Sequence, residues 1–535
     1  MLRSTLFISP ACLVIAAAPL FLSAESTPAK PETATGYVYH DLNADGIKQP
    51  EEVGLADVAV SNGSDVTLTD ATGQYSLPVD DDTALFVIKP AGYTVPVNKQ
   101  MLPQFYYLHK PNGSPTDLKY DGVAPTGPLP ESVDFGLYES GGQESFRVLL
   151  FGDPQPRTLD HIASFEKDII TEVTNIQGVD FGITLGDIVS DNLDLFDPIN
   201  TAIAKTGIPF FYVYGNHDMN FDVDHDHLAD ETFERVYGPA TYAFYHGEAL
   251  FLILDNVIYP NGGGRYIGGF TEKQLTFFEN LFETVPEDTL IVLCMHIPLF
   301  EEPMFGDTFR DEDRNHLFSL LKKFPRTFSL SAHTHSQRHH FFTAEDNWPQ
   351  DNPHHHYNVA TTSGSWWSGP MDERGVPDRT MHDGTAVGYA FLNVEGNDFT
   401  YDYKVTNEPP ETQMRLHVPK VMRLSDYRTQ IMANIYNATE KATVHLKVTT
   451  HEKARWTPMR RIETVDPHYM SLMLERDLAE EPAPGSNYGS PSLSKHLWRG
   501  SIPKSIQPGA HTVEVRFVDI FGRTFIQSQD FLVEE

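Results

Sequence analysis

An apolar run ends at residues 213–218 in the sequence VYGNHD, which places Asn216, His217 and Asp218 in consecutive positions. The run begins at Phe210 and is aromatic and β-branched, which is typical of a buried strand. The glycine lets the chain turn sharply, so the three polar side chains should lie at the carboxyl end of this strand, where open α/β sheets bind their ligands. Alone, the triplet favours an ordinary polar loop, and its meaning depends on whether the pattern recurs.

The pattern recurs between residues 145 and 405, where apolar runs alternate with amphipathic stretches as in an α/β fold. A helix is expected after the first run, from about Leu159 to Ile176. Each run is followed by side chains of the types that bind metals. Together with Asn216, these are Asp153, Gln155, Asp187, His296, His333 and His335. Because they occupy the same end of successive strands, they predict one shared site.

The candidate ligands are oxygen and nitrogen donors without a thiolate. Mixed carboxylate and imidazole ligation suits divalent ions such as Mn²⁺, Fe or Zn²⁺ and argues against an iron–sulfur or structural cysteine site. The set is too large for one tetrahedral ion, whereas two ions that share one carboxylate use it naturally. Such ion pairs clamp phosphoryl oxygens and lower the pKa of a water molecule, which makes hydroxide available for attack on phosphorus.

The ordered motifs resemble those of the calcineurin-like metallophosphoesterase superfamily. They are GDPQ at 152–155, GD at 186–187, GNHD at 215–218, His296 and AHTH at 332–335. The resemblance covers about residues 145–405 and implies an α/β fold, a four-layer αββα sandwich. Two positions depart from the usual pattern, because Gln155 stands where the family has His and Ala332 stands where it has Gly.

The resemblance also implies roles for individual residues. His217 would stabilise charge on the phosphate or protonate the leaving oxygen, and Asp218 would orient its imidazole. Asp187 would bridge the two ions. The first ion would be bound by Asp153, Gln155 and His335, and the second by Asn216, His296 and His333. Since Gln155 is a neutral donor, the first ion would be held less tightly or would be a harder ion.

Finer features resemble secreted bacterial phosphoesterases that carry a β module on each side of the catalytic domain. Trp366 and Trp367 lie in a Gly/Ser loop after the last candidate ligands and could line the substrate pocket. Packing against the sheet edge is the alternative. Three further stretches carry metal-type side chains, Asp222–His227, His339–His340 and His354–His356. The first could bind another cation, but a solvated acidic loop is expected there. The spacing of the other two fits no defined site, and surface or rim positions are expected for them.

Two stretches of short alternating runs flank this region, which is an all-β pattern. Residues 36–138 resemble the prealbumin-like β-sandwich modules of bacterial surface proteins. Residues 410–535 are expected to form a C-terminal β-sandwich, interrupted by a polar insert at 477–494. The first module contains the spacing of a calcium loop, for which a solvated turn is the alternative. The candidate calcium ligands are Asp41, Asn43, Asp45 and Glu52.

The first residues have the pattern of a secretory signal peptide at 1–24, with Arg3 before an apolar stretch and small residues near Ala24. An uncleaved anchor is the alternative, because Leu22 is larger than usual before a cleavage site. A linker rich in Pro and Thr is expected at 25–35. No other run approaches the ~18 apolar residues of a membrane helix, so no membrane span is expected in the mature chain. The predicted location is secreted, periplasmic or cell-surface.

The chain has 74 acidic and 39 basic side chains and a net charge of −35. This charge argues against a nucleic acid duplex or an anionic membrane as partner. Cys12 lies in the expected signal peptide, so the mature chain would keep only Cys294 and could form no intramolecular disulfide. Cys294 lies in an apolar run, which favours a buried, inert thiol.

We therefore expect a secreted, two-metal-dependent phosphoesterase that hydrolyses phosphate mono- or diesters, on small-molecule or glycan-linked substrates. A narrower phosphodiesterase or nucleotidase is the alternative among enzymes. From a different class, a catalytically redundant surface-binding protein is the alternative. The nearly complete ligand set and the intact triplet at 216–218 argue against that last reading.

Overall fold

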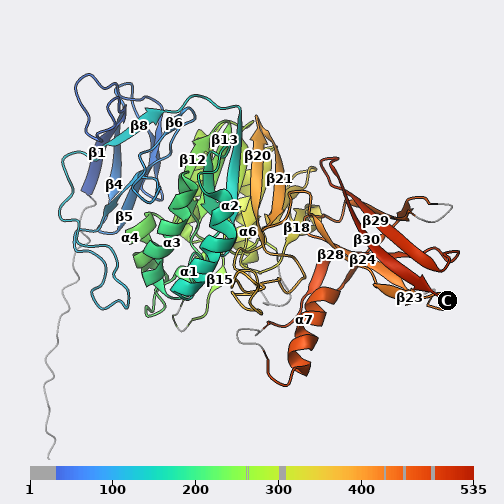
Figure 1. Cartoon of the computed structure of the whole chain (residues 1–535). Helices are drawn as coiled ribbons and strands as arrows, with labels where there is room; N and C mark the ends of the chain where they lie inside the picture. Colours follow the sequence, from blue (N-terminus) through green and yellow to red (C-terminus); the bar gives the residue numbers. More distant parts are fainter. Residues whose placement is uncertain are drawn as a thin grey trace, which may run out of the picture.

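The computed structural model describes residues 32–260, 262, 264–300, 309–426, 429–449, 454–482 and 488–535. The signal peptide expected at 1–24 therefore lies outside the described residues. Figure 1 shows a β module, a central α/β domain and a second β module arranged in a row. This arrangement confirms the expected fold class, an α/β domain flanked by two all-β modules.

The first sheet of the central domain combines three parallel strands with an antiparallel hairpin. Every residue of the parallel strands at 181–184 and 210–212 is buried, as expected for strands covered on both faces. In sheet order the strands are β11 (Phe210–Tyr212), β10 (Phe181–Thr184), β9 (Ser145–Phe151), β20 (Gly388–Glu395) and β21 (Asp398–Val405).

The second sheet has parallel inner strands and an antiparallel strand at each edge. In sheet order the strands are β12 (Tyr242–His246), β13 (Ala249–Leu254), β16 (Leu290–Met295), β17 (Thr327–Ser331), β19 (His354–Asn358) and β18 (Arg338–Phe342). A separate short pair is formed by β14 (Val257–Ile258) and β15 (Ile267–Gly268).

The two sheets pack face to face through aromatic side chains. The ring centroid of Phe181 in β10 lies 5.3 Å from that of Phe251 in β13. Phe328 in β17 lies 6.4 Å from Tyr401 in β21, with nearly parallel rings. Large apolar side chains on both sheets therefore bury each other in the middle of the domain and contribute to its core.

Helices cover the outer faces and complete the αββα order. Phe165 of α1 packs on Phe151 of the first sheet at 5.6 Å, and Phe318 of α6 packs against His354 of the second at 6.1 Å. A π-helical turn joins α1 to α2, so the helix expected to reach Ile176 ends earlier. The helices are α1 (Leu159–Phe165), α2 (Thr171–Val173), α3 (Phe196–Ile203), α4 (Glu231–Tyr237), α5 (Glu272–Thr284) and α6 (Asp311–Leu321).

The N-terminal module is a sandwich of two four-stranded sheets. Lys110 joins it to the central domain through ion pairs with Glu231 at 2.7 Å and Glu234 at 2.8 Å, both in α4. β1 begins at Glu32, inside the stretch expected as a linker, because residues 32–37 pair with β4. One sheet is β4 (Gln74–Val79), β1 (Glu32–His40), β8 (Phe135–Glu139) and β6 (Tyr93–Thr94), and the other is β3 (Val66–Leu68), β2 (Ala59–Ser61), β5 (Thr83–Val87) and β7 (Tyr106–His109).

The C-terminal module is also a two-sheet sandwich. Arg523, between its last two strands, is paired with Asp402 of β21 at 2.5 Å, which docks the module on the central domain. One sheet is β22 (Met414–His417), β24 (Gln430–Ile435), β28 (Leu493–Ser501) and β27 (Arg460–Val465). The other is β23 (Val421–Arg423), β30 (Thr524–Glu534), β29 (Gly509–Val518), β25 (Thr443–Val448) and β26 (Thr457–Pro458).

A helix, α7 (Pro467–Leu478), interrupts this module, where the sequence pattern indicated only strands and a polar insert. Asp466 caps it by accepting hydrogen bonds from the N–H groups of His468 and Tyr469, and proline at the first position suits a helix start. The helix projects from the body of the protein (Figure 1). The capping motif, rather than apolar periodicity, was the local signal for it.

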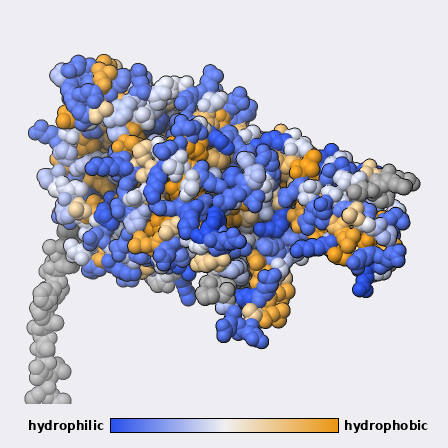
Figure 2. Space-filling view, in the orientation of Figure 1, coloured by the Kyte–Doolittle hydropathy of each residue, from blue (hydrophilic) through white to orange (hydrophobic). Residues whose placement is uncertain are grey.

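Hydrophilic residues cover most of the face in Figure 2, with orange patches that include the projecting helix α7. On α7, Leu474 and Leu478 expose 50% and 81% of their surface. Within the described part of the chain, no helix combines the length and apolar character needed to cross a membrane.

Candidate metal centre

The side chains singled out at the strand ends come together at one edge of the two sheets. They follow the carboxyl ends of β9, β10 and β11 in the first sheet and of β16 and β17 in the second. Six of them are at most 2% exposed, and His333 is partly buried. The six are Asp153, Gln155, Asp187, Asn216, His296 and His335.

His296 is the centre of one group of converging acceptor atoms. Its Nδ1 lies 2.8 Å from the carbonyl oxygen of Leu185, which can only accept, so the proton is on Nδ1. Its Nε2 then faces Asp187 Oδ1 at 3.2 Å, Asn216 Oδ1 at 3.1 Å and His333 Nδ1 at 3.1 Å. Ligand atoms of the two histidines and the aspartate all lie within 4.8 Å of one another. The two oxygens that face Nε2 repel its lone pair unless a cation or a proton lies between them.

A second group forms around His335 in the same way. Its Nδ1 lies 2.6 Å from the carbonyl oxygen of Gly364, which fixes the proton there. Its Nε2 faces Asp153 Oδ2 at 3.3 Å. Asp153 Oδ2 and Gln155 Oε1 are both buried without a hydrogen-bond partner among the described residues. Buried oxygens in this state are costly unless they bind an ion, so the donor set of this group also fits a metal.

Asp187 connects the two groups. Its Oδ1 faces His296 and accepts a hydrogen bond from the backbone N–H of His217 at 2.8 Å, and its Oδ2 accepts one from Gln155 Nε2 at 2.9 Å. Burial raises the pKa of Asp187, but the imidazoles of His296 and His217 outweigh burial and lower it. Burial likewise lowers the pKa of His296, but Asp187 and Asp153 raise it to about 9. Positive charge is therefore favoured at this position.

The backbone at these ligands is held in an unfavourable conformation. Five of them have positive φ angles, which cost about 1–2 kcal/mol for a residue with a side chain. Such strain is concentrated at functional sites, where the surrounding structure imposes it. The residues are Asp153 (φ 32°), Gln155 (43°), Asp187 (48°), His333 (67°) and His335 (47°).

Two glycines let the loops approach closely. A Cβ atom at Gly215 would lie 2.1 Å from the backbone nitrogen of Asp187, and one at Gly186 would lie 2.5 Å from Nδ1 of His296. No side chain fits at either position. The glycines in the GD and GNHD motifs are therefore required by the packing of the strand-end loops against each other.

His217 is oriented by Asp191 and not, as the resemblance implied, by Asp218. Its Nδ1 lies 2.6 Å from Asp191 Oδ1. Asp218 is turned away and accepts hydrogen bonds from the backbone N–H groups of Ile188, Val189 and Gly215, at 3.0–3.2 Å. It thus ties two strand-end loops together.

The charges around His217 favour its protonated form. Burial lowers its pKa, but Asp187 and the hydrogen bond to Asp191 outweigh burial and raise it to about 9. Burial raises the pKa of Asp218 to about 8, and the nearby charge of Asp187 adds to the shift.

The two tryptophans occupy different environments. The ring of Trp366 stacks on His335 with centroids 4.1 Å apart, so it adjoins the candidate centre. Trp367 is 5% exposed and donates from Nε1 to the carbonyl oxygen of Pro154 at 2.8 Å. The guanidinium of Arg379 lies over its ring at 4.6 Å. Trp367 packs beneath the first ligand loop, while Trp366 is partly exposed beside His335.

Three residues near the centre were not expected from the sequence. Asp191 lies four positions after Asp187 in a loop, without a motif to mark it. The ring of Tyr266 lies 6.0 Å from His333. Tyr120 belongs to the N-terminal module, and its hydroxyl donates to the carbonyl oxygen of Asp191 at 3.0 Å. Residues from distant parts of the chain meet here only through the tertiary fold.

The histidines at 354–356 are buried, which corrects the expected surface or rim position. They lie in β19, where His354 and His356 hydrogen-bond to serines of β17. Burial lowers the pKa of His354 to about 3, so it is neutral at ordinary pH. His339 and His340 are partly buried in the adjacent strand, and burial also lowers their pKa values.

The other polar features have ordinary structural environments. Asp222 and Asp226 accept hydrogen bonds from the backbone N–H groups of Lys119 and Tyr259, and the loop around them is mostly exposed. Cys294 is buried as expected, and burial raises the pKa of its thiol.

In the candidate calcium loop, each side chain accepts hydrogen bonds from the loop backbone. Asp41 accepts from Ala44 and Gly46, and Glu52 accepts from Leu42 and Gln49. Both carboxylates are 3% exposed, so they point into the loop. Asn43 and Asp45 are exposed and form Asx-type turns.

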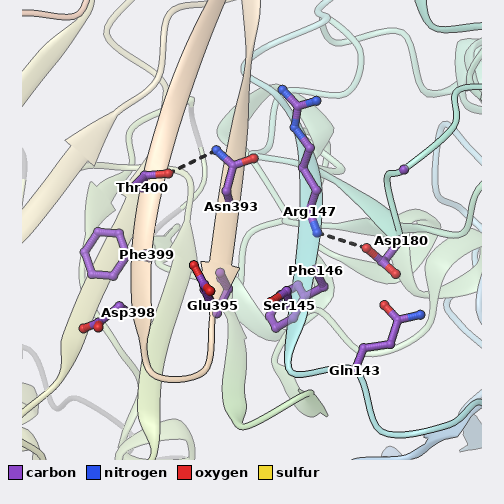
Figure 3. A pocket seen from close by; sticks show the side chains of 12 residues that line it. Gln143, Ser145, Phe146, Arg147, Asp180, Asn393, Glu395, Asp398, Phe399 and Thr400 are labelled. Carbon is purple, nitrogen blue, oxygen red and sulfur yellow. Dashed lines mark hydrogen bonds between the residues drawn. The ribbon is translucent and has the colours of Figure 1, made fainter. Parts of the chain in front are cut away.

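A pocket of about 580 Å³ lies at the opposite end of the central domain (Figure 3). It is lined by residues at the start of β9, including Ser145 and Arg147, and by the β20–β21 hairpin. The candidate ligands follow the other end of β9, so this pocket is separate from them. In Figure 3 the Arg147 side chain extends along β9 away from Glu395 and Asp398.

Comparison with protein families gives matches over most of the chain. Residues 146–337 match the model described as Calcineurin-like phosphoesterase. Residues 42–123 match the model for the N terminal of Calcineurin-like phosphoesterase, and residues 356–525 match the model for its C terminal. Along the chain, the three matches follow the same order as the N-terminal module, the central domain and the C-terminal module.

Individual relatives are distant. A protein of Moraxella catarrhalis (strain BBH18), described as a probable cyclic nucleotide phosphodiesterase, is 26% identical over 168 residues, or 29% of this chain and 58% of the relative. This chain thus spans little more than half of that relative's length.

Two solved structures resemble the chain at 12% identity. A dimetal phosphatase from Danio rerio has a TM-score of 0.33, with 48% of this chain and 95% of that chain covered. A purple acid phosphatase from yellow lupin (Lupinus luteus) seeds has a TM-score of 0.35, with 70% and 67% covered.

The family matches include the segment that carries the strand-end ligands through His335, together with both flanking modules. The chain therefore belongs to the calcineurin-like phosphoesterase family.

Proposed function

We propose that this protein hydrolyses phosphate mono- or diesters with two divalent ions held at the candidate metal centre. The observation that carries the proposal is the arrangement around His296, whose Nε2 faces Asp187 Oδ1, Asn216 Oδ1 and His333 Nδ1 at 3.1–3.2 Å. A cation or a proton is needed between Nε2 and the two oxygens, Asp187 Oδ1 and Asn216 Oδ1. The second group at His335, with two orphaned buried oxygens, has the same requirement.

The two groups of side chains support the following ligand assignment. One ion would be held by Asp153, Gln155 and His335, the other by Asn216, His296 and His333, with Asp187 between them. Mn²⁺, Fe and Zn²⁺ suit these donors. When bound, the two ions would supply the acidity that activates water and the positive charge that neutralises phosphoryl oxygens.

His217 is the residue we assign to the leaving group. Its contact with Asp191 uses Nδ1 and leaves Nε2 for the substrate. A protonated imidazole held in one orientation can neutralise charge on the phosphate or give a proton to the departing oxygen. Asp187, through the backbone N–H of His217, fixes the distance between this residue and the centre.

The substrates we propose are small-molecule or glycan-linked phosphoesters, because the ligands address the phosphate and not the group attached to it. Trp366, on the ring of His335, and Tyr266, beside His333, provide aromatic surface at two sides of the centre. The test panel should therefore include aryl monoesters, aryl diesters and a cyclic nucleotide.

The experiment is a metal-reconstituted assay with Mn²⁺, Fe²⁺ and Zn²⁺. We expect turnover by the wild type and a large loss in His217→Ala and Asp187→Asn. His316→Ala serves as the matched control, because His316 is an exposed histidine of α6 paired with Glu279. Undiminished turnover in both site variants, or none by the wild type with any ion, would contradict the proposal.

We also propose that residues 1–24 direct secretion and that the protein acts in the periplasm, at the cell surface or outside the cell. The apolar stretch after Arg3 and the small residues near Ala24 support this. Fractionation of expressing cells, followed by N-terminal sequencing of the exported protein, tests it. Retention of the full-length chain in the cytoplasm would contradict it.

A calcium ion in the loop at residues 41–52 is a further proposal. The support is the ligand spacing and the inward direction of the carboxylates of Asp41 and Glu52. Ca²⁺ should raise the melting temperature of the wild type and have little effect on Glu52→Gln. An equal response of both proteins to Ca²⁺ would assign the effect to another site.

A further inference from the structure

A continuous line of buried hydroxyl and imidazole groups runs along β17 and β19 towards the candidate metal centre. The two strands are parallel and pair Ser329 with His356 and Ser331 with Asn358, so alternate residues share one face. This is the face that α6 covers, and the groups along it are 0% exposed except at the first residue. We call this line the hydroxyl–imidazole ladder; it consists of Thr327, His354, Ser329, His356 and Ser331, and it ends at Asn358.

Asn358 connects the ladder to the loop that carries two candidate ligands. Its Nδ2 donates to the carbonyl oxygen of Ser336 and to Oγ1 of Thr334, both at 2.8 Å. Thr334 lies between His333 and His335, and Ser336 follows them. The amide of Asn358 therefore holds the backbone on one side of the histidine pair and the side chain between them.

The direction of every hydrogen bond in the ladder follows from one atom. The carbonyl oxygen of Ser336 can only accept, so the nitrogen of the Asn358 amide faces it and the oxygen faces away. That oxygen accepts the proton of Ser331, at 2.9 Å. Having given its only proton, Ser331 must accept from His356 Nε2, at 2.7 Å.

The same reasoning continues to the far end. His356 carries its proton on Nε2, so its Nδ1 accepts from Ser329 at 2.6 Å. Ser329 must then accept from His354 Nε2 at 2.7 Å, and His354 Nδ1 accepts from Thr327 at 2.7 Å. Both imidazoles are neutral with the proton on Nε2, and every donor and acceptor of the ladder is used once. Rotating the Asn358 amide would reverse or break each of these bonds.

We propose that Asn358 is a positioning residue for the metal centre, which holds the loop of His333 and His335, and that Ser331, at the end of the hydroxyl–imidazole ladder, keeps the Asn358 amide in the orientation that does so. The inference rests on the proposed function because it takes these two histidines as ligands. Residues behind metal ligands that set their orientation typically change metal affinity by roughly 10- to 100-fold when removed. Asn358 acts through the loop backbone and Thr334, and does not touch the centre itself.

The test compares two serines that are equivalent within the ladder. Ser331→Ala and Ser329→Ala each remove one buried hydroxyl and two hydrogen bonds, so both should lower stability similarly. Only Ser331 contacts Asn358. We expect metal affinity, measured by calorimetry, to fall roughly 10-fold or more in Asn358→Ala. It should fall several-fold in Ser331→Ala and less than about twofold in Ser329→Ala.

The tautomers provide an independent readout. In the wild type, ¹⁵N-edited NMR should show the proton on Nε2 for both His354 and His356. A proton on Nδ1 of either would overturn the inference, and so would wild-type affinity in Asn358→Ala or equal losses in the two serine variants. If Asn358→Ala does not fold, the comparison of the two serine variants decides. Failure of the wild type to bind metal would instead contradict the proposed function.

Discussion

The Nδ1 atom of His217 lies 2.6 Å from Oδ1 of Asp191, whereas the adjacent carboxylate of Asp218 accepts three backbone N–H groups. Two aspartates close to one histidine thus have separate tasks. Asp191 sets the orientation and charge of the imidazole. Asp218 holds the loop after β10 against the loop after β11.

This division predicts that replacing Asp191 lowers activity, whereas replacing Asp218 lowers stability. Asp191→Asn should lower kcat by roughly 10- to 100-fold, because a neutral amide no longer favours the protonated imidazole of His217. Stability should change little, because the Asp191 side chain is exposed. Asp218→Ala should lower the free energy of unfolding by on the order of 3 kcal/mol, because it leaves buried N–H groups without acceptors. Steady-state kinetics and denaturant unfolding separate the effects, and a stable, inactive Asp218→Ala protein would contradict the assignment.

The strand-end ligands could be predicted from sequence because each follows an apolar run, and the edge of a parallel sheet gathers such positions. Asp191 could not be, since its partner His217 is on another strand-end loop and no local pattern joins them. His354 and His356 were assigned to surface or rim positions because three successive histidines look polar. Their burial depends on Ser329 and Ser331, which lie 25 residues away along the chain and become neighbours only when β17 and β19 pair.

Removal of the divalent ions should destabilise the central domain as well as abolish turnover. Without them, Asp153 Oδ2 and Gln155 Oε1 stay buried without a hydrogen-bond partner among the described residues, so ion binding favours the folded state. With free ion at about 100 times its dissociation constant, the linkage contributes about 2.7 kcal/mol. Thermal unfolding before and after chelation, and after return of Mn²⁺ or Zn²⁺, measures this. Asp187→Ala should show little response to either step, and a full wild-type response in that variant would exclude Asp187 as a shared ligand.

Acid should destabilise the folded protein through its buried histidines. Burial lowers the pKa of His339 to about 3, while an unfolded histidine titrates near 6.5. Between these values the unfolded chain binds a proton that the folded chain does not, so the free energy of unfolding falls as the pH decreases. Each such histidine contributes up to about 1.4 kcal/mol per pH unit. His339→Phe, which keeps an aromatic ring against Tyr357 and Tyr401, should flatten this dependence between pH 6 and 4.

The exposed His316 supplies the control for this measurement, because His316→Phe changes a histidine that is not enclosed by the sheets. Denaturant unfolding at several pH values gives the slopes. An unchanged slope in His339→Phe would show that the acid sensitivity arises elsewhere.

Replacing each of the two neighbouring tryptophans should show which one contributes to the metal centre and which one only packs in the core. Trp367→Ala should lower stability by about 3–5 kcal/mol, because it empties a buried site beneath Pro154 and exposes Arg379. Trp366→Ala should be milder for stability but should weaken metal binding or raise KM, because the lost ring stacks on His335. Trp366→Phe retains an aromatic face and should recover most of the loss. Melting temperatures, metal affinity and kinetics of the three variants decide this. If Trp366→Ala matched the wild type in KM and metal affinity, Trp366 would have no part in substrate or metal binding and its ring would contribute packing alone.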